Sequence, residues 1–173
     1  MVKNDLTQKY DKPTILIHWL TALLILVLFP LGKYVEELEQ IEKLEFLKIH
    51  VIVGIIVFVL SIYRSYLYFK SPRPPHLKTG SEFNDKLIIW VHNIFYILLF
   101  LIPVTGIVAL ITTGYGEAVF ARDISLVKPH KGSIPLETHE ILSTIMMIVF
   151  ALHVIGVIKH KILTKENTIK RIS

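Results

Sequence analysis

The sequence predicts an all-α membrane protein in which four transmembrane helices form one bundle. Of its 173 residues, 53% are hydrophobic, and the mean hydropathy of +0.57 is typical of a small group of membrane helices. The apolar residues gather in four separate runs, each near the roughly 20 residues that a helix needs to cross a bilayer. Lysine and arginine are unequally divided between alternating connectors, as expected of a chain with a fixed membrane topology.

The first apolar run, residues 14–32, follows Pro13, a residue that suits the first turn of a helix. A basic start before an apolar run also occurs in signal peptides. This run is long for one, and no small-residue cleavage site follows it, so we expect a retained transmembrane helix. Residues 33–48 are charged and have a helical periodicity, which predicts a separate helix on the membrane surface.

The other apolar runs predict three further spans, at residues 49–69, 87–111 and 137–161. The connector 70–86 contains three prolines and is expected to be a loop. Pro103 and Gly106 predict a kink in the third span. The longest connector is 112–136, and a basic tail follows the fourth span. The whole chain, residues 1–173, is expected to be a single domain.

The basic residues predict that both termini lie in the cytoplasm. With that orientation, the inner segments hold thirteen of the nineteen lysines and arginines, and the outer connectors hold six. The inner set is Lys3, Lys9, Lys12, Arg64, Lys70, Arg73, Lys78, Lys86, Lys159, Lys161, Lys165, Lys170 and Arg171, and the outer set is Lys33, Lys43, Lys48, Arg122, Lys128 and Lys131. The acidic residues lean outward, but they contribute little to this rule.

Two histidines in the fourth span lie on one face of the helix. His139 and His153 are fourteen residues apart, which is about four helical turns and about 21 Å along the axis. Histidine is rare inside a membrane span and usually needs a partner. In the predicted orientation, His50 lies at the outer level of His139. His18 and His92 both lie at the inner level of His153.

Paired histidines of this kind predict two haem sites. Two neutral imidazoles that face each other across an apolar bundle are the usual axial ligands of a b-type haem. The outer pair is His50 with His139. The inner pair combines His153 with either His18 or His92, and spacing alone does not decide between them. The chain has no cysteine, and no carboxylate accompanies the pairs, which disfavours zinc and excludes cysteine-ligated iron–sulfur clusters.

Each histidine taken singly could have a purely structural role, because a lone histidine in an apolar helix is more often a hydrogen-bonded core residue than a ligand. The level-matched pairs carry the haem prediction. Arg64 lies fourteen residues after His50, so it shares a helix face with His50 at the inner level. A buried arginine needs a partner, and haem propionates would pair with it in bidentate fashion. The alternative is an arginine that extends to the inner headgroups.

Several stretches resemble the bacterial cytochrome b561 family of four-helix, di-haem membrane proteins. They are IHWL at 17–20, IHV at 49–51, YR at 63–64, SPRPP at 71–75, IPVTGIV at 102–108, THE at 138–140, LHVIGVIKH at 152–160 and KENTIKRI at 165–172. The resemblance covers all four spans and nearly the whole chain. It implies a bacterial inner-membrane protein with His18 and His153 on the inner haem. For the outer haem it implies His50 and His139.

The resemblance also implies an activity. Short members of the family oxidise superoxide at the outer face and reduce ubiquinone in the membrane. The alternative is a haem b subunit that relays electrons from a periplasmic hydrogenase or dehydrogenase to quinone. His92 and His160 have matching histidines in the family pattern, and both are expected at the inner side, where they could serve a quinone headgroup.

The donor side is less well defined by the sequence. An anionic donor such as superoxide favours basic residues at the outer face. The connector 112–136 offers a local basic cluster, Arg122, Lys128, His130 and Lys131. The connector 33–48 is acidic, however. The charges of the outer connectors therefore give at most weak support for an anionic donor. Met146 lies between His139 and His153 and is expected to pack in the core between the two haems.

Overall fold

The computed structural model describes residues 4–129 and 132–173, and it confirms the predicted all-α fold. Within this part of the chain, four helices are long and apolar enough to cross a membrane: α1 (Lys12–Glu37), α2 (Gln40–Lys70), α3 (Glu82–Thr113) and α5 (Ile134–Thr164). The short elements are α4 (Tyr115–Ala121), η1 (Ile124–Leu126) and η2 (Thr168–Ile172).

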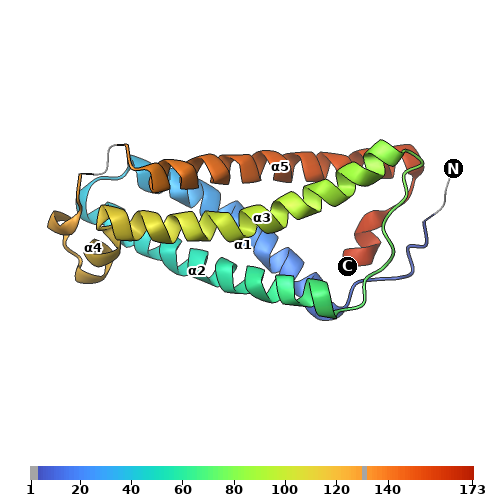
Figure 1. Ribbon diagram of the computed structural model, residues 1–173, viewed down its shortest axis with the longest axis horizontal. Coiled ribbons are helices and arrows are strands. Elements are labelled where there is room, and N and C mark those ends of the chain that lie inside the picture. Colours follow the sequence, from blue (N-terminus) through green and yellow to red (C-terminus); the bar gives the residue numbers. More distant parts are fainter. Residues whose placement is uncertain (1–3, 130–131) are drawn as a thin grey trace.

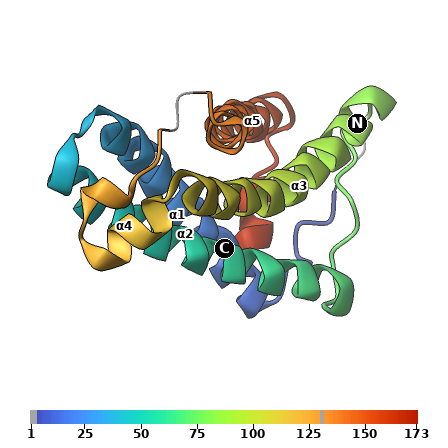
Figure 2. The same ribbon diagram turned by 60° about the vertical axis from the view of Figure 1, so that its left-hand side comes forward.

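The two ends of the bundle differ in what they carry. Figure 1 shows both termini at one end, which we call the terminal end, and α4 at the other, which we call the α4 end. The side of the membrane that each end faces stays a prediction, as does the single-domain organisation. Figures 1 and 2 both show α3 between α5 and α2, and α3 packs on both of these helices while α1 packs on α2.

Helix boundaries follow local sequence signals. The carboxylate of Asp11 accepts the backbone N–H of Thr14 at 3.3 Å and so caps α1, which also has a proline in its first turn. The same carboxylate accepts the hydroxyl of Ser71 at 2.9 Å, which ties the start of α1 to the end of α2. Helix α3 ends at Gly114, where φ is +79° and a side chain would collide with the carbonyl oxygen of Leu126.

The prediction of a separate surface helix at residues 33–48 is wrong. Helix α1 continues to Glu37 and α2 begins at Gln40, so only two residues separate the two helices. Glutamate, lysine and leucine are good helix formers, and this stretch has no proline or glycine that would stop a helix. Bilayer thickness limits the apolar part of a spanning helix, not the helix itself.

The connector 112–136 also contains more structure than the sequence predicted. Helix α4 and η1 fold against the extended start of α2. A small core forms there from Leu44, Ala118 and Val119, all at most 3% exposed. At the α4 end, the chain beyond the apolar spans is therefore folded around a small core of its own.

The bundle core lies midway between the two ends. It is built from Val57 of α2, Leu98 and Leu99 of α3, and Met146 of α5. Met146 is 3% exposed, which confirms its predicted place in the core. Pro103 lies inside α3, and Figure 1 shows that α3 is bent rather than straight.

Candidate haem-binding sites

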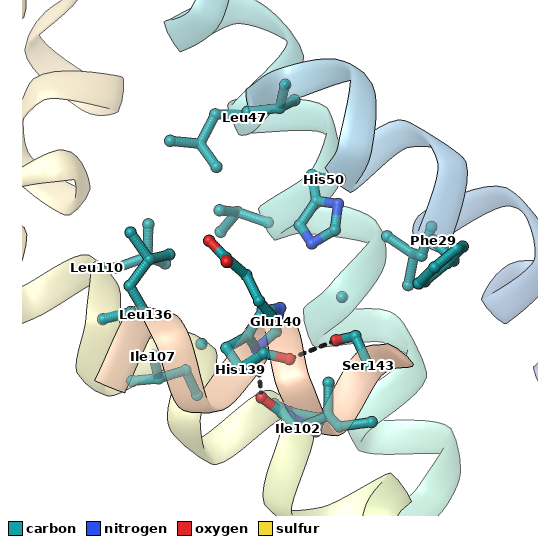
Figure 3. Close-up of a pocket in the computed structure, with 18 of the residues that line it drawn as sticks. Phe29, Leu47, His50, Ile102, Ile107, Leu110, Leu136, His139, Glu140 and Ser143 are labelled. Carbon is teal, nitrogen blue, oxygen red and sulfur yellow. Dashed lines mark hydrogen bonds between the residues drawn. The ribbon is translucent and has the colours of Figure 1, made fainter. Parts of the chain in front are cut away.

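The structure brings His50 of α2 and His139 of α5 together near the α4 end. Their ring centroids are 6.2 Å apart, with the ring planes at 74°. Both rings line an apolar cavity of about 280 Å³ to which all four long helices contribute (Figure 3). Bonds from imidazole nitrogen to a metal are about 2 Å long, so one metal ion fits between two rings at this spacing. We call this pair the outer site.

A hydrogen bond fixes the tautomer of His139. Its Nδ1 lies 2.8 Å from the carbonyl oxygen of Ile102 in α3, and a carbonyl can only accept (Figure 3). Nδ1 therefore carries the proton, and Nε2 keeps its lone pair for a metal. Metal-binding histidines usually donate their other N–H in this way.

Two glycines make room for the two imidazoles. A Cβ atom on Gly32 of α1 would lie 3.1 Å from Cε1 of His50. A Cβ atom on Gly106 of α3 would lie 3.0 Å from both Cε1 and Nδ1 of His139. Each ring is thus seated against a neighbouring helix at a position where a larger residue would displace it.

The outer site fits a haem by its chemistry as well as its spacing. The cavity wall is mainly aliphatic and aromatic, as a porphyrin requires. Nδ1 of His50 is buried and has no hydrogen-bond partner among the described residues. A buried polar atom without a partner is rare and needs an explanation. A haem at this site would be held by Nε2 of His139 and by the imidazole of His50.

Four charged side chains also line this cavity, and none of them was predicted as a site residue: Lys33, Glu36, Lys43 and Glu140. Lys33 forms an ion pair with Glu36 at 2.9 Å, and Lys43 donates to the backbone carbonyl of Glu36 at 3.4 Å. Glu36 and Glu140 lie close enough for their charges to interact. The position of Glu140, next to His139, was the signal that could have indicated this charged rim.

The basic residues predicted for the donor side lie elsewhere. Arg122 forms an ion pair with Glu45 at 3.0 Å and lines a separate cavity of about 220 Å³. The backbone N–H of Lys128 donates to the carbonyl of Thr113 at 2.9 Å. Neither residue lines the cavity of the outer site. The predicted Lys131, like His130, falls outside the described residues. The lysines that line the cavity are therefore Lys33 and Lys43.

A second group of histidines lies toward the terminal end. His153 of α5 has its ring 5.4 Å from that of His92 and 5.5 Å from that of Phe95, both in α3. His18 of α1 is close enough to both histidines for their charges to interact. Thr21, one turn after His18, is fully buried and its hydroxyl has no partner in the described chain. We call this group the inner site.

The two candidate partners of His153, His18 and His92, have different hydrogen bonds at Nδ1. Nδ1 of His92 lies 2.7 Å from the carbonyl oxygen of Ile88, so His92 carries its proton on Nδ1 and presents Nε2. Arg64 donates to Nδ1 of His18 at 3.1 Å, because a guanidinium cannot accept. The structure thus brings His18, His92, His153 and Arg64 together, as predicted, without choosing the inner ligand pair.

His160 has different neighbours. Its Nε2 is 3.2 Å from Oε2 of Glu166, and both side chains are mostly buried. Glu166 also accepts the backbone N–H and the side-chain amide of Asn4, at 2.9 and 2.7 Å. His160 therefore belongs to a set of contacts that ties the C-terminal segment to the N-terminal segment.

The four apolar helices, with imidazoles grouped at two levels, define a membrane cytochrome of the four-helix type. The chain belongs to the prokaryotic cytochrome b561 family, because the sequence model of this family matches residues 9–173. It is therefore a multi-pass bacterial membrane protein of electron transport, and the family implies b-type haem. The chain is similar to a Yersinia pestis protein named probable superoxide oxidase CybB. The two are 25% identical over 171 residues, which cover 95% of each chain.

Proposed function

We propose that this protein transfers electrons across the bacterial inner membrane from superoxide, at the α4 end, to ubiquinone. The observation that carries the proposal is the outer site, where His50 and His139 face each other in an apolar cavity with one tautomer fixed. The name of the Yersinia pestis relative supports superoxide as the donor. Two b-type haems, when bound, would supply one-electron carriers at two depths.

The reaction balances with two donor molecules for each quinone. Each superoxide ion gives up one electron and leaves as O₂. Ubiquinone takes up two electrons and two protons and becomes ubiquinol. Lys33 and Lys43, at the cavity of the outer site, would attract the anionic donor, while Glu36 and Glu140 would oppose it.

At the inner site we propose His18 and His153 as the ligand pair. A ligating Nε2 leaves the histidine proton on Nδ1, so Arg64 must release Nδ1 of His18 when the haem binds. His92, with its proton on Nδ1, would then present the lone pair of Nε2, which can accept a hydrogen bond from a quinol hydroxyl or take up a proton and donate it to the quinone carbonyl. We also propose His160, which contacts Glu166 at the same end, as a second residue that serves the quinone.

The purified protein tests this proposal directly. We expect a reduced-minus-oxidised spectrum of b-type haem and two haems per chain by the pyridine haemochromogen assay. Addition of an enzymatic superoxide source should reduce the haems and, with a soluble ubiquinone analogue, form ubiquinol at half the rate of superoxide loss. A protein without haem, or one whose haems superoxide does not reduce, would contradict the proposal.

The second candidate is a relay subunit for a periplasmic hydrogenase or dehydrogenase. One observation favours it: the extensions of α1 and α2 expose an acidic surface at the α4 end, formed by Glu36, Glu37, Glu39, Glu42 and Glu45. A basic partner could dock there. Isolation from native membranes under mild detergent distinguishes the two, because a relay subunit should co-purify with its dehydrogenase and should not respond to superoxide alone.

A further inference from the structure

The terminal end contains a buried arginine that has no acidic ion-pair partner among the described residues. Arg171, in η2, is only 5% exposed. Its Nε donates to the carbonyl of Gln8 at 3.3 Å, which uses one of the five N–H donors of the guanidinium. A buried charge needs a counter-charge or further hydrogen bonds. The other four N–H donors of Arg171 have no hydrogen-bond partner in the described part of the chain.

Two more arginines lie on one aromatic platform at the same end. The guanidinium carbon of Arg73 is 3.9 Å from the ring centre of Tyr68, and that of Arg64 is 5.5 Å from the ring centre of Tyr96. The two tyrosine rings are 5.1 Å apart. Stacking of this kind holds the plane of a guanidinium while leaving its N–H edge free for an acceptor.

All three arginines lie close enough to the side chain of Tyr10 for their charges to interact with it. Burial raises the pKa of Tyr10, and the positive charges of Arg171, Arg73 and Arg64 all act against that shift. The backbone N–H of Tyr10 also donates to the carbonyl of Arg171 at 3.0 Å. The phenol of Tyr10 and three guanidinium groups, from four parts of the chain, are thus gathered at the terminal end.

Within the part of the chain that the structure describes, no carboxylate forms an ion pair with any of these arginines. Asp5 is close enough for its charge to interact with Arg171, but its oxygens accept from Thr7 and Gln8. Three cations and a phenolic donor without an internal anion are typical of a site for a bound oxyanion.

We propose that Arg64, Arg73, Arg171 and the hydroxyl of Tyr10 form a binding site for an oxyanion, either a carboxylate or a phosphate. Two sources have this chemistry. One is a propionate of the haem at the inner site, because Arg64 already contacts His18; this source rests on the proposed function. The other is the headgroup of an anionic phospholipid, because the site lies at the end of a membrane bundle.

The site exists only when three distant segments have assembled. The indole N–H of Trp19 donates to the carbonyl of Ile172 at 2.7 Å, and the backbone N–H of Lys78 donates to the side chain of Asn4 at 2.8 Å. These bonds join the C-terminal segment to α1, and the N-terminal segment to the loop after α2. The C-terminal segment thereby places Arg171 beside residues that are more than 90 positions away in the sequence.

The test compares Arg171→Gln and Arg73→Gln with Lys170→Gln, a control that removes the same charge from an exposed neighbour. All are purified as full chains with haem added during expression. Three quantities are measured: haem per chain, the midpoint potential of each haem, and phospholipid retained in detergent, by mass spectrometry. Arg73 is exposed, so its variant keeps the test valid should Arg171→Gln fail to fold.

If a propionate occupies the site, both variants should lose the inner haem about tenfold more readily, since hydrogen bonds to charged groups are worth about 1.5–3 kcal/mol each. The potential of the inner haem should also fall, because a nearby positive charge favours the reduced form, while the outer haem stays unchanged. Arg171→Lys should recover part of this difference.

If a phosphate occupies the site, the variants should lose tightly bound anionic phospholipid and keep both haem potentials. A result in which haem content, potentials and lipid all match those of Lys170→Gln would overturn the site. Wild-type protein that lacks an inner haem but retains lipid through these arginines would contradict the proposed function and leave the oxyanion site standing.

Discussion

The outer and inner sites contain the same kind of ligand but are built differently. The outer site has one histidine from each of two helices, a cavity between them, and a glycine behind each ring. The inner site has three histidines and an arginine in mutual contact or close electrostatic reach. Helix geometry alone therefore pairs the two histidines proposed as outer ligands, whereas the proposed inner pair depends on which contacts break when a haem binds.

The largest expected effects come from removing single ligands. His139→Ala should abolish the outer haem and leave the inner haem, because only the outer haem loses an axial ligand. His153→Ala should abolish the inner haem and leave the outer haem for the same reason. The haem count should fall from two to one in each variant, with the loss assigned by redox titration. Thr138→Val, at a partly exposed neighbour of His139, is the matched control. Retention of both haems in either variant would refute the ligand assignment.

The next largest effects are expected from variants that test whether His18 or His92 pairs with His153 at the inner haem. We expect His18→Ala to lose the inner haem completely, and His92→Ala to keep both haems while ubiquinone reduction falls by about tenfold or more. Haem content and steady-state reduction of a ubiquinone analogue measure the two effects. The opposite pattern would establish His92 with His153 as the ligand pair, in agreement with their ring contact.

The glycines of the outer site are a sharper test of its geometry. Gly106→Val should displace the ring of His139 and weaken outer haem binding by about tenfold or more, since overpacking costs about 1–3 kcal/mol. Gly32→Val should act in the same way on His50. Gly156→Val is the control, because nothing lies within 4 Å of a Cβ atom at that position and Gly156 does not line the cavity of the outer site. Equal haem affinity in all three variants would show that the rings are not seated by these contacts.

A smaller effect is expected at the charged rim of the outer site. Glu140→Gln should speed reduction by superoxide about two- to fivefold, and Lys43→Gln should slow it by a similar factor, in line with the modest worth of partly exposed charges. Stopped-flow reduction at several salt concentrations measures both rates. A neutral donor would give no such opposite pair of changes, and neither rate would depend on salt.

The smallest effect concerns the segments at the terminal end. Hydrogen bonds from Asn4 lower the pKa of Glu166 below its usual 4.5. A carboxyl group with a lowered pKa adds stability above its unfolded pKa and loses it as the pH falls. Asn4→Ala should therefore lower the free energy of unfolding by about 1 kcal/mol at pH 7, and the difference should shrink as the pH falls below 4.5. Thermal melts of wild type and variant across pH 3.5–7, about the range a lowered carboxyl pKa covers, would show it; a pH-independent difference would contradict it.

The sequence by itself determined the four spans, the two histidine levels and the core position of Met146. These features are local: apolar runs have the length of a bilayer, and residues fourteen apart share a helix face. The sequence-based prediction is wrong at residues 33–48, because charged residues end the apolar part of a span but not the helix, and α1 and α2 continue into this stretch.

Only the tertiary structure decided the features in which distant segments meet. Lys33, Glu36 and Glu140 line one cavity in the structure, whereas Arg122 pairs with Glu45 and does not line the outer site. The structure also brings Arg171 against Gln8, a contact between the two ends of the chain. Periodicity fixes the depth of a side chain and the face of its own helix. The neighbour opposite that face depends on how helices, loops and termini pack together, which no local pattern encodes.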